Sequence, residues 1–418
     1  MLDKRLSTAV LACACVLLNP AAKADLIDDS KLNVELRNFY MNRDFRHDNG
    51  PGKTPQSRQE SWSQAVYARY TSGYTEGTIG FGVDVAGFYA LKLDGGAGTG
   101  GDGNMSLNPG EQASDISRAG ATLKTRYSNS TLKLGLLEPR LPVIFADDAR
   151  LLPQTFQGVM LESEELKGFK FTAGQLWNTS TRASSDQEPF YLALGPATNP
   201  KNNSNDLSFA GVDATLSDHF SASYYYAQLE DIYEQHYVGG NMRLPLGEKT
   251  NLLGTLSYFD NGEQGKEHYG KIDNRAYGLR LGVQHGSHTL TAAYQRMLGD
   301  SMFPMLHGGT PQPYLVNWVT NGGFFFAQER SYQLRYDLNF AALGVPGLSL
   351  MSRYIKGTAI KRSAGDGHEY ERDTDVRYVV QSGSLKDLSL LLRTSTVRSS
   401  YGNDYDEVRF ITSYPFSF

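Results

Sequence analysis

The sequence has very few cysteines and no long apolar run beyond its start, and both absences restrict what the chain can be. Its only two cysteines, Cys13 and Cys15, lie within the first 24 residues. If that segment is removed, the remaining chain has no thiol, which excludes disulfides, cysteine-ligated zinc and a cysteine nucleophile. After Leu18 no apolar run approaches the roughly 20 residues that a membrane-spanning helix needs. A transmembrane helix is therefore excluded.

The sequence also lacks a basic excess and the common motifs of catalytic sites. It has 40 Lys and Arg against 45 Asp and Glu, which argues against a nucleic-acid-binding protein. Its eight histidines are scattered, with no H-E-x-x-H motif and no pair at metal-ligand spacing. It has no G-x-S-x-G motif either. We therefore expect no metal, no other cofactor and no nucleic-acid partner.

The first residues have the features of a secretory signal peptide. A basic start and an apolar core too short to span a bilayer are followed by an A-x-A cleavage site that ends at Ala24. We predict a signal peptide over residues 1–24 and one mature domain over residues 25–418. As an alternative, Cys13 would be a lipoprotein cysteine, but the apolar core would then have only about six residues, which is shorter than usual.

Alternating polar and apolar residues recur along the rest of the chain. In the last segment, the residues from Val408 in steps of two are Val, Phe, Thr, Tyr, Phe and Phe, whereas the intervening positions are largely polar. Side chains alternate between the two faces of a β-strand, so such a segment has one apolar and one polar face. We count about eighteen such segments, near 31–41, 61–71, 78–93, 116–127, 131–138, 156–163, 168–176, 206–216, 219–230, 234–244, 251–260, 274–285, 288–298, 328–340, 347–358, 370–382, 386–398 and 405–418.

The connections between these segments alternate between long and tight. A β-sandwich has no reason to sort its connections by length, whereas an outer-membrane barrel has long external loops and short periplasmic turns. Tyrosines near the predicted strand ends favour the same interpretation, because their rings suit the two membrane interfaces. We therefore predict an all-β fold, an 18-stranded antiparallel transmembrane β-barrel, in the outer membrane of a Gram-negative bacterium. The long connections are 42–60, 94–115, 139–155, 177–205, 261–273 and 299–327, and the tight ones include 127–130, 216–219, 286–287 and 383–385.

The predicted inward faces carry many basic residues and few acids. An excess of lumenal Arg and Lys would create a positive field along the pore and would suit the passage of anions. The alternative is that each lumenal Arg pairs with a lumenal acid and only stiffens the wall. The basic positions are Arg37, Arg69, Lys124, Arg126, Arg280, Arg335, Arg353, Arg377, Arg393 and Arg409, and the acids are Glu35, Asp84, Asp337 and Glu407.

The segment 138–158, EPRLPVIFADDARLLPQTFQG, is the most distinctive loop. Its prolines make it stiff and it is too polar to face lipid, so we predict that it folds inward and narrows the pore. Arg150 would offer a planar fork that fits a carboxylate. Asp147 and Asp148 would position this fork or repel the wrong charge. The alternative is an ordinary external loop closed by a salt bridge.

Several long motifs together resemble the OprD (Occ) family of outer-membrane carboxylate channels. They include LNVELRNFYMNRDFR, YTEGTIGFGVDVAGFYALKLDGG, RLLPQTFQG and LRYDLNFAALGVPGLSLMSRYIKG, and they occur in order over nearly the whole mature chain. The resemblance implies an 18-stranded barrel, monomeric or loosely trimeric, through which small carboxylate solutes diffuse into the periplasm. It also implies a lumenal basic ladder and a constriction formed by the third external loop with help from the seventh.

The resemblance also implies roles for individual residues. A terminal aromatic such as Phe418 would be recognised by the barrel-assembly machinery. Ladder positions, constriction-loop positions and two weaker candidates in neighbouring loops would contact the solute. The ladder positions are Arg37, Lys124, Arg126, Arg377 and Arg393, the constriction loop contributes Asp147, Asp148 and Arg150, and the weaker candidates are Arg46 and Arg182.

Two features favour the branch of this family that resembles channels for benzoate and other cyclic carboxylates (OccK-like). Relatives specific for basic amino acids tend to carry a second Arg two positions before Arg393, where this chain has Leu391. The loop 299–327 is apolar and aromatic rather than acidic. We therefore predict passive uptake of small aromatic or cyclic carboxylates, with basic amino acids or small peptides as the alternative within the family. Alternatives of another class are a lipase-like barrel enzyme and an adhesin or structural barrel with a plugged lumen.

Overall fold

The computed structural model describes the whole chain except residues 1–25, 47–55, 109–110, 195–201, 308–311 and 364. The predicted signal peptide and its cleavage site after Ala24 lie outside the described residues. Within the described part, no helix is long and apolar enough to cross a membrane.

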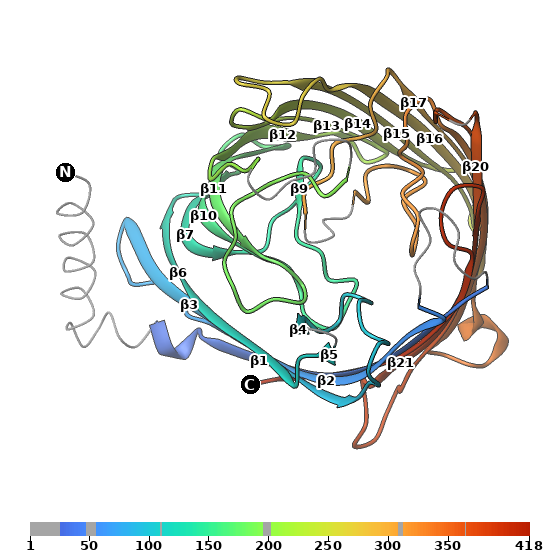
Figure 1. Cartoon of the computed structure of the whole chain (residues 1–418). Helices are drawn as coiled ribbons and strands as arrows, with labels where there is room; N and C mark the ends of the chain where they lie inside the picture. The colour runs from blue at the N-terminus through green and yellow to red at the C-terminus, as the bar shows by residue number, and fades with distance from the viewer. Residues whose placement is uncertain (1–25, 47–55, 109–110, 195–201, 308–311, 364) are drawn as a thin grey trace.

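Eighteen antiparallel strands form one closed barrel (Figure 1). Each strand of the barrel pairs with its neighbours along the chain, and β1 (Lys31–Phe45) pairs with β22 (Tyr405–Ser417) to close the ring. The predicted 18-stranded all-β barrel is therefore confirmed. The other strands of the wall are β2 (Arg58–Thr71), β3 (Ile79–Asp94), β6 (Asp115–Tyr127), β7 (Ser130–Leu137), β10 (Thr155–Ser163), β11 (Phe169–Ser180), β12 (Leu207–Ser217), β13 (Phe220–Leu229), β14 (Tyr233–Pro245), β15 (Thr250–Glu263), β16 (Asp273–His285), β17 (His288–Leu298), β18 (Arg330–Asn339), β19 (Leu348–Ile360), β20 (Gly367–Val379) and β21 (Ser389–Ser399).

Short elements also lie outside the wall. They are the hairpin of β4 (Leu107–Asn108) and β5 (Glu111–Gln112), the hairpin of β8 (Arg140–Leu141) and β9 (Ile144–Phe145), and the 3₁₀ helix η1 (Phe340–Leu343).

The two ends of the barrel differ in the length of their connections. At one end β6 is joined to β7 by residues 128–129, and β16 to β17 by residues 286–287. At the other end the connections 138–154, 181–206 and 299–329 are long. In barrels that cross the outer membrane the long loops are external and the short turns periplasmic, so we call these ends the external end and the turn end.

The outer face of the wall is apolar and aromatic, as the alternation of residues predicts. Leu334 in the middle of β18 exposes 57 % of its surface, and Phe418 exposes 76 %. The backbone of Phe418 extends the closing pair, because its N–H donates to the carbonyl of Leu32 at 2.9 Å. A soluble monomer rarely exposes so continuous an apolar face, whereas a barrel in lipid requires one.

The buried core lies inside the barrel, between the wall and the inserted loops. Val143 and Ile144 of the loop 138–154 belong to one cluster with Tyr237 of the wall. Leu151 and Leu152 of the same loop are fully buried in a second cluster that includes inward residues of β1 and β2. Each fully buried leucine stabilises this arrangement by about 1.5–3 kcal/mol. The prediction that this loop folds inward is confirmed.

The predicted balance of inward charge is wrong at β20. Arg377 was assigned to the inward face, but the same period of two continues back along the strand. It places Glu369, Glu371, Asp373 and Asp375 on the lumenal side, where they bond wall arginines, a loop tyrosine and the backbone of the loop 299–329. The lumen therefore holds more acids than the sequence analysis counted, and much of its basic charge is paired.

Candidate functional site

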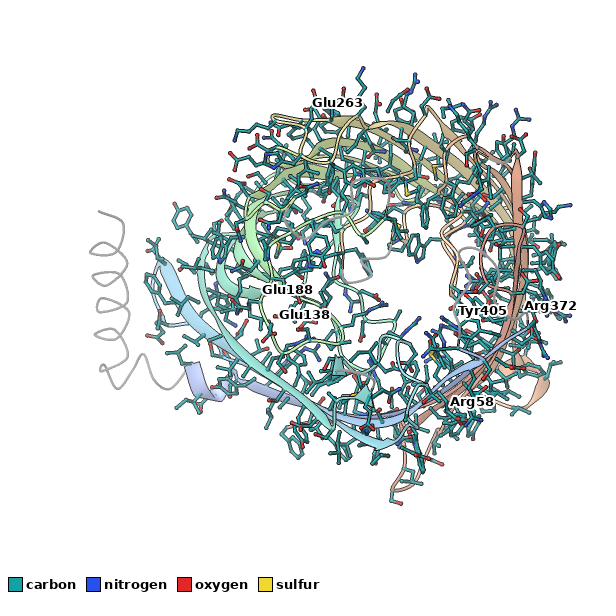
Figure 2. All side chains as sticks on the ribbon, viewed as in Figure 1. Arg58, Glu138, Glu188, Glu263, Arg372 and Tyr405 are labelled. Atoms are coloured by element: carbon teal, nitrogen blue, oxygen red, sulfur yellow. The ribbon has the colours of Figure 1, made fainter. Side chains whose placement is uncertain are left out.

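The wall and three inserted loops enclose a cavity of about 520 Å³ inside the barrel. The wall contributes residues of β1, β19, β21 and β22, and the loops are 138–154, 181–206 and 299–329. Figure 1 shows β9 and the orange segment of the loop 299–329 inside the ring of strands. Figure 2 shows Tyr405 on the lumenal side of the wall. The lining residues are Arg43, Asp147, Ala149, Arg150, Arg182, Leu194, Met305, Trp318, Val319, Thr320, Asn321, Phe325, Arg353, Arg393, Tyr405 and Arg409.

Two arginines of the wall each bond a carboxylate of β20. Arg353 donates its Nε to Asp373 at 2.7 Å. Arg393 donates Nε and Nη2 to the two oxygens of Asp375 at 2.7 and 2.5 Å. Both bonds join neighbouring strands, and the charge of each guanidinium is offset by its own partner.

Two further wall arginines share one buried carboxylate. Arg43 donates its Nε to Glu407 at 2.9 Å, and Arg409 donates its Nε to the other oxygen at 2.5 Å. The Nη2 atoms of both also donate to Oδ1 of Asn321 in the loop 299–329, each at 3.0 Å. This shared pairing connects the barrel closure at β1 and β22 to the inserted loop.

Arg150 differs from the wall arginines because no carboxylate bonds it within the described residues. Its Nε donates to the carbonyl of Asp102 at 3.0 Å and its Nη1 to the carbonyl of Ala149 at 3.1 Å. Burial lowers the pKa of Arg150 well below its usual range, and the nearby guanidinium groups of Arg409 and Arg182 lower it further. An anion that enters the cavity would offset this cost of holding the charge.

The path of the loop around Arg150 is set by bonds to the wall. Arg37 on β1 donates one Nη1 both to Asp148 at 2.7 Å and to the carbonyl of Arg150 at 3.0 Å. The N–H of Leu151 donates to Oδ1 of Asn104 at 3.2 Å. Arg37 and Asp148, which were predicted as solute contacts, therefore hold the loop and do not line the cavity.

Asp147 and Arg182 form a second buried contact within the inserted loops. Asp147 accepts a bond from Arg182 and one from the N–H of Ala149 at 2.7 Å. Burial raises the pKa of Asp147, whereas the charge of Arg182 opposes that shift. Arg182, a weaker candidate in the sequence analysis, thus lies in the constriction together with Arg150.

The loop 299–329 supplies the aromatic side of the cavity. The rings of Trp318 and Phe325 stack with centroids 5.9 Å apart. Glu371 holds this loop by accepting the N–H groups of Asn321 at 2.9 Å and Gly322 at 2.7 Å. The loop 299–329, between β17 and β18, is the seventh external loop. It therefore enters the pore, as the family resemblance implied.

The loops 181–206 and 299–329 are joined to each other by a short pairing. The N–H of His307 donates to the carbonyl of Tyr191 at 2.9 Å, and that of Ala193 to the carbonyl of Met305 at 2.8 Å. The imidazole of His307 stacks on the ring of Tyr191 with centroids 3.8 Å apart. Burial lowers the pKa of His307 to about 4, so this contact is neutral at ordinary pH.

The remaining predicted residues lie toward the ends of the pore. Arg46 follows β1 at the external end and bonds Asp406 of β22. Lys124 donates to the carbonyl of Ser72 at 2.7 Å. Arg126 lies over the ring of Tyr74, with 4.5 Å from its guanidinium carbon to the centroid.

Lys124 and Arg126 line a second cavity of about 860 Å³ at the turn end. Arg377 also lies at the turn end and donates to Ser389 at 3.3 Å. Of the ten predicted site residues, Asp147, Arg150, Arg182 and Arg393 line the constriction. Of the other six, Arg37 and Asp148 hold the inserted loop, Arg46 lies at the external end, and Lys124, Arg126 and Arg377 lie at the turn end. Their role as a ladder stays a prediction.

Sequence reasoning missed several residues of the constriction. Arg43 was left out because the predicted strand ended at residue 41, whereas the alternation that begins at Arg37 continues to residue 45. Arg353 and Arg409 were assigned to the inward face but were not selected as site residues. Asn321 had no signal in the sequence, because only the path of its loop brings it to the wall.

Comparison with known proteins identifies the family. A family model described as outer membrane porin, OprD family, matches residues 24–418. The chain belongs to the OprD family of outer-membrane porins. This OprD-family chain is 38 % identical over 395 residues to the porin-like protein GalP of Pseudomonas putida, over 94 % of the chain and 93 % of the relative.

Solved structures of related porins have the same barrel. A BenF-like porin from Pseudomonas fluorescens is 38 % identical, with a TM-score of 0.90, over 94 % of this chain and all of that one. The structure of OpdK of Pseudomonas aeruginosa with vanillate is 34 % identical, with a TM-score of 0.87 and the same coverage. These relatives are porins rather than enzymes.

Membership in the OprD family carries consequences for location and activity. The barrel is embedded in the outer membrane, with the external end outside and the turn end in the periplasm, and solutes pass through it passively. Cleavage after Ala24, recognition of Phe418 by the assembly machinery and the monomeric or trimeric state stay predictions.

Proposed function

We propose that this porin takes up small aromatic or cyclic carboxylates, of which benzoate is the simplest, and that Arg150 holds the carboxylate. One observation carries the proposal. Arg150 is the cavity-lining arginine that has only main-chain acceptors within the described residues, whereas its neighbours bond carboxylates. A planar guanidinium whose charge is not offset is suited to a carboxylate from the solute.

The aromatic side of the cavity supports a ring as the other half of the solute. Trp318 and Phe325 present stacked rings to the same cavity as Arg150. Aromatic pairs add about 0.5–1.5 kcal/mol beyond the burial of their area. A cavity of about 520 Å³ is within the range of small-ligand sites.

A related structure supports the same class of solute. The structure of OpdK, 34 % identical to this chain, contains vanillate, which is an aromatic carboxylate. In this chain, Arg126 and Arg377 at the turn end, which no carboxylate bonds within the described residues, would attract the anion beyond the constriction.

Uptake of a basic amino acid is less well supported. Such a solute would need a lumenal acid for its ammonium group. Asp373 and Asp375 are suitably placed on β20, but each already bonds an arginine of the wall. Glu371 is buried under the loop 299–329 and bonds its backbone. The acids near the constriction are therefore already engaged in bonds within the protein.

Uptake of four labelled solutes by proteoliposomes tests the proposal. We expect benzoate and cyclohexanecarboxylate to enter faster than hexanoate, which lacks a ring, and arginine to enter slowest. Equal rates for benzoate and hexanoate would contradict the ring specificity. Fastest entry of arginine would instead place the chain among the channels for basic amino acids.

A further inference from the structure

The outer face of the wall carries a row of basic side chains near its external end. The row consists of Arg296 on β17, Arg330 on β18, Lys356 on β19 and Arg372 on β20, and we call it the outer basic row. These residues point away from the lumen because the residues before them, such as Gln295 and Glu371, are buried inside it. Figure 2 shows Arg372 on the outer side of the wall.

The charges of this row are not offset by the protein. Within the described residues, no carboxylate bonds any member of the outer basic row, and the Nε of Arg296 is buried without a hydrogen-bond partner. Neighbouring cations are different, because Arg275 lies 3.5 Å from Asp273 and Lys361 lies 2.8 Å from Asp300. The row therefore holds four positive charges that need an external counter-charge.

Two members of the row face each other directly. Arg296 and Arg330 are cross-strand partners in the register of β17 and β18. Directly opposed residues have Cβ atoms roughly 4.5–5.5 Å apart, and like charges at such positions destabilise the sheet. This repulsion is removed if an anion lies between the two guanidinium groups.

The depth of the row corresponds to the membrane interface. Tyrosines lie beside it on the same outer face: the rings of Tyr294 and Tyr332 are 5.1 Å apart, and those of Tyr354 and Tyr370 are 5.7 Å apart. Tyr354 is the direct cross-strand partner of Arg372. Because tyrosines mark the head-group level of a membrane, the row lies at the depth of lipid phosphates and above the hydrocarbon.

The row is confined to one side of the barrel. At the external ends of other strands the outward residues include acids, namely Asp44 on β1, Glu234 on β14 and Asp260 on β15. Arg58 at the external end of β2 also points outward, but it lies 3.5 Å from Glu60, so its charge is offset, unlike the charges of the row. The charge of the row fits an anionic partner that approaches from the membrane on that side.

We propose that the outer basic row binds the phosphate groups of a phosphorylated lipid of the external leaflet. Arginine forks bond phosphate in a bidentate manner, and the paired Arg296 and Arg330 offer two such forks at one place. The tyrosines beside the row would pack against the lipid below its head group. This site lies outside the pore and does not depend on the solute proposed above.

Native mass spectrometry of the purified barrel tests this proposal with two forms of one glycolipid. We expect lipid A with two phosphates to bind about tenfold more tightly than the same lipid without phosphate. The double variant R296Q/R330Q should bind both forms alike. The matched control is R58Q, which removes an outward arginine of the external end of β2 that lies 3.5 Å from Glu60, and it should keep the preference.

Two further measurements keep the outcomes distinct. The conductance of R296Q/R330Q should equal that of the unchanged protein, which shows that the barrel is folded and the pore intact. An undiminished phosphate preference in the double variant would overturn the proposal. Displacement of the lipid by millimolar inorganic phosphate would also overturn it, because the site would then recognise a free ion rather than a lipid.

Discussion

The wall of the barrel and the inserted loops both supply arginines to the constriction, but they treat the charge differently. On the wall, Arg353 and Arg393 are bonded to acids of β20, the adjacent strand. In the inserted loop, Arg150 bonds only main-chain carbonyls within the described residues. The same residue type therefore stiffens the barrel in one region and keeps its charge available in the other.

The difference has a geometric cause. Antiparallel pairing places a residue of one strand directly opposite a residue of the next, so a lumenal arginine and a lumenal acid can be matched by register. Asp375 and Arg393 are such partners. A loop has no register, and the surroundings of its side chains depend on where its backbone is anchored. Removing a partner on the wall should therefore affect folding, and removing Arg150 should affect transport.

The largest effect is expected from the wall. The variant Glu407→Gln removes the carboxylate shared by Arg43 and Arg409, which leaves two buried charges without their partner. Breaking a buried ion pair in this way costs about 3–5 kcal/mol. Unfolding by urea in lipid vesicles measures this loss. Protein that still folds should pass anions at least as well as the unchanged porin, because Arg150 keeps its charge and Arg43 and Arg409 lose their carboxylate.

A half-exposed pair on the same kind of wall provides the control. Asp337 accepts a bond from Arg335 at 2.8 Å but stays accessible to water in the lumen. The variant Asp337→Asn should lower the free energy of unfolding by less than about 1 kcal/mol. Equal losses of unfolding free energy in Glu407→Gln and Asp337→Asn would show that burial does not determine how much each ion pair stabilises the barrel.

The next effect concerns the loop. The variant Arg150→Gln should reduce benzoate flux about tenfold, which corresponds to about 1.4 kcal/mol, because the uncompensated positive charge is lost. The barrel should keep its stability. The matched control is the double variant Arg393→Gln/Asp375→Asn, which removes a bonded pair without changing the net charge and should keep the flux within about twofold. A larger loss in the double variant than in Arg150→Gln would reverse the comparison between wall and loop.

The sequence predicts the wall far better than the site. The period of two identified all eighteen strands, because each strand separates lipid from water and must alternate. The same alternation also predicts the inward acids of β20, if it is continued from Arg377, and the inward position of Arg43, if it is continued from Arg37. Arg43 lies beyond the predicted segment 31–41, whereas Glu371, Asp373 and Asp375 lie within the predicted segment 370–382 but were not counted as inward acids.

The electrostatics of the constriction could not be read from the sequence. That Arg393 is bonded to a carboxylate depends on the register of β20 and β21. Arg150 instead bonds the carbonyl of Asp102, and it is the path of another loop that brings this carbonyl to the site. The sequence analysis predicted a role in solute binding for both arginines, and only the structure separates them.

A smaller effect is expected from pH, and it should act on the loops alone. The pKa of His307 is lowered to about 4 by burial, whereas an exposed histidine has a pKa of about 6.5. Between these values the opened loops bind a proton that the closed loops do not. The free energy of opening therefore falls as the pH drops from about 6.5 toward 4, and the contact is most stable above pH 6.5.

Hydrogen exchange measures this opening. From these two pKa values we expect the free energy of opening to fall by about 1.5 kcal/mol, or protection to fall about tenfold, between pH 6.5 and 5. The amides of His307 and Ala193 should report it, after correction for intrinsic rates. The variant His307→Phe should remove the pH dependence, and amides of the wall strands should show none. A pH dependence that persists in this variant would assign the effect to another group.

The smallest effect concerns the ring of the solute, and it tests whether the loops provide more than charge. Phe325 lines the cavity and stacks with Trp318, so the variant Phe325→Ala removes a ring contact but leaves Arg150 in place. We expect the ratio of benzoate to hexanoate uptake to fall about threefold, because a ring contact contributes about 0.5–1.5 kcal/mol. Phe145→Ala, in the other inserted loop and outside the cavity lining, should keep the ratio. If both variants changed the ratio equally, the packing of the loops rather than the ring at Phe325 would set the preference. If neither did, the constriction would select charge alone, and the wall and loops would differ only in which arginine is left unpaired.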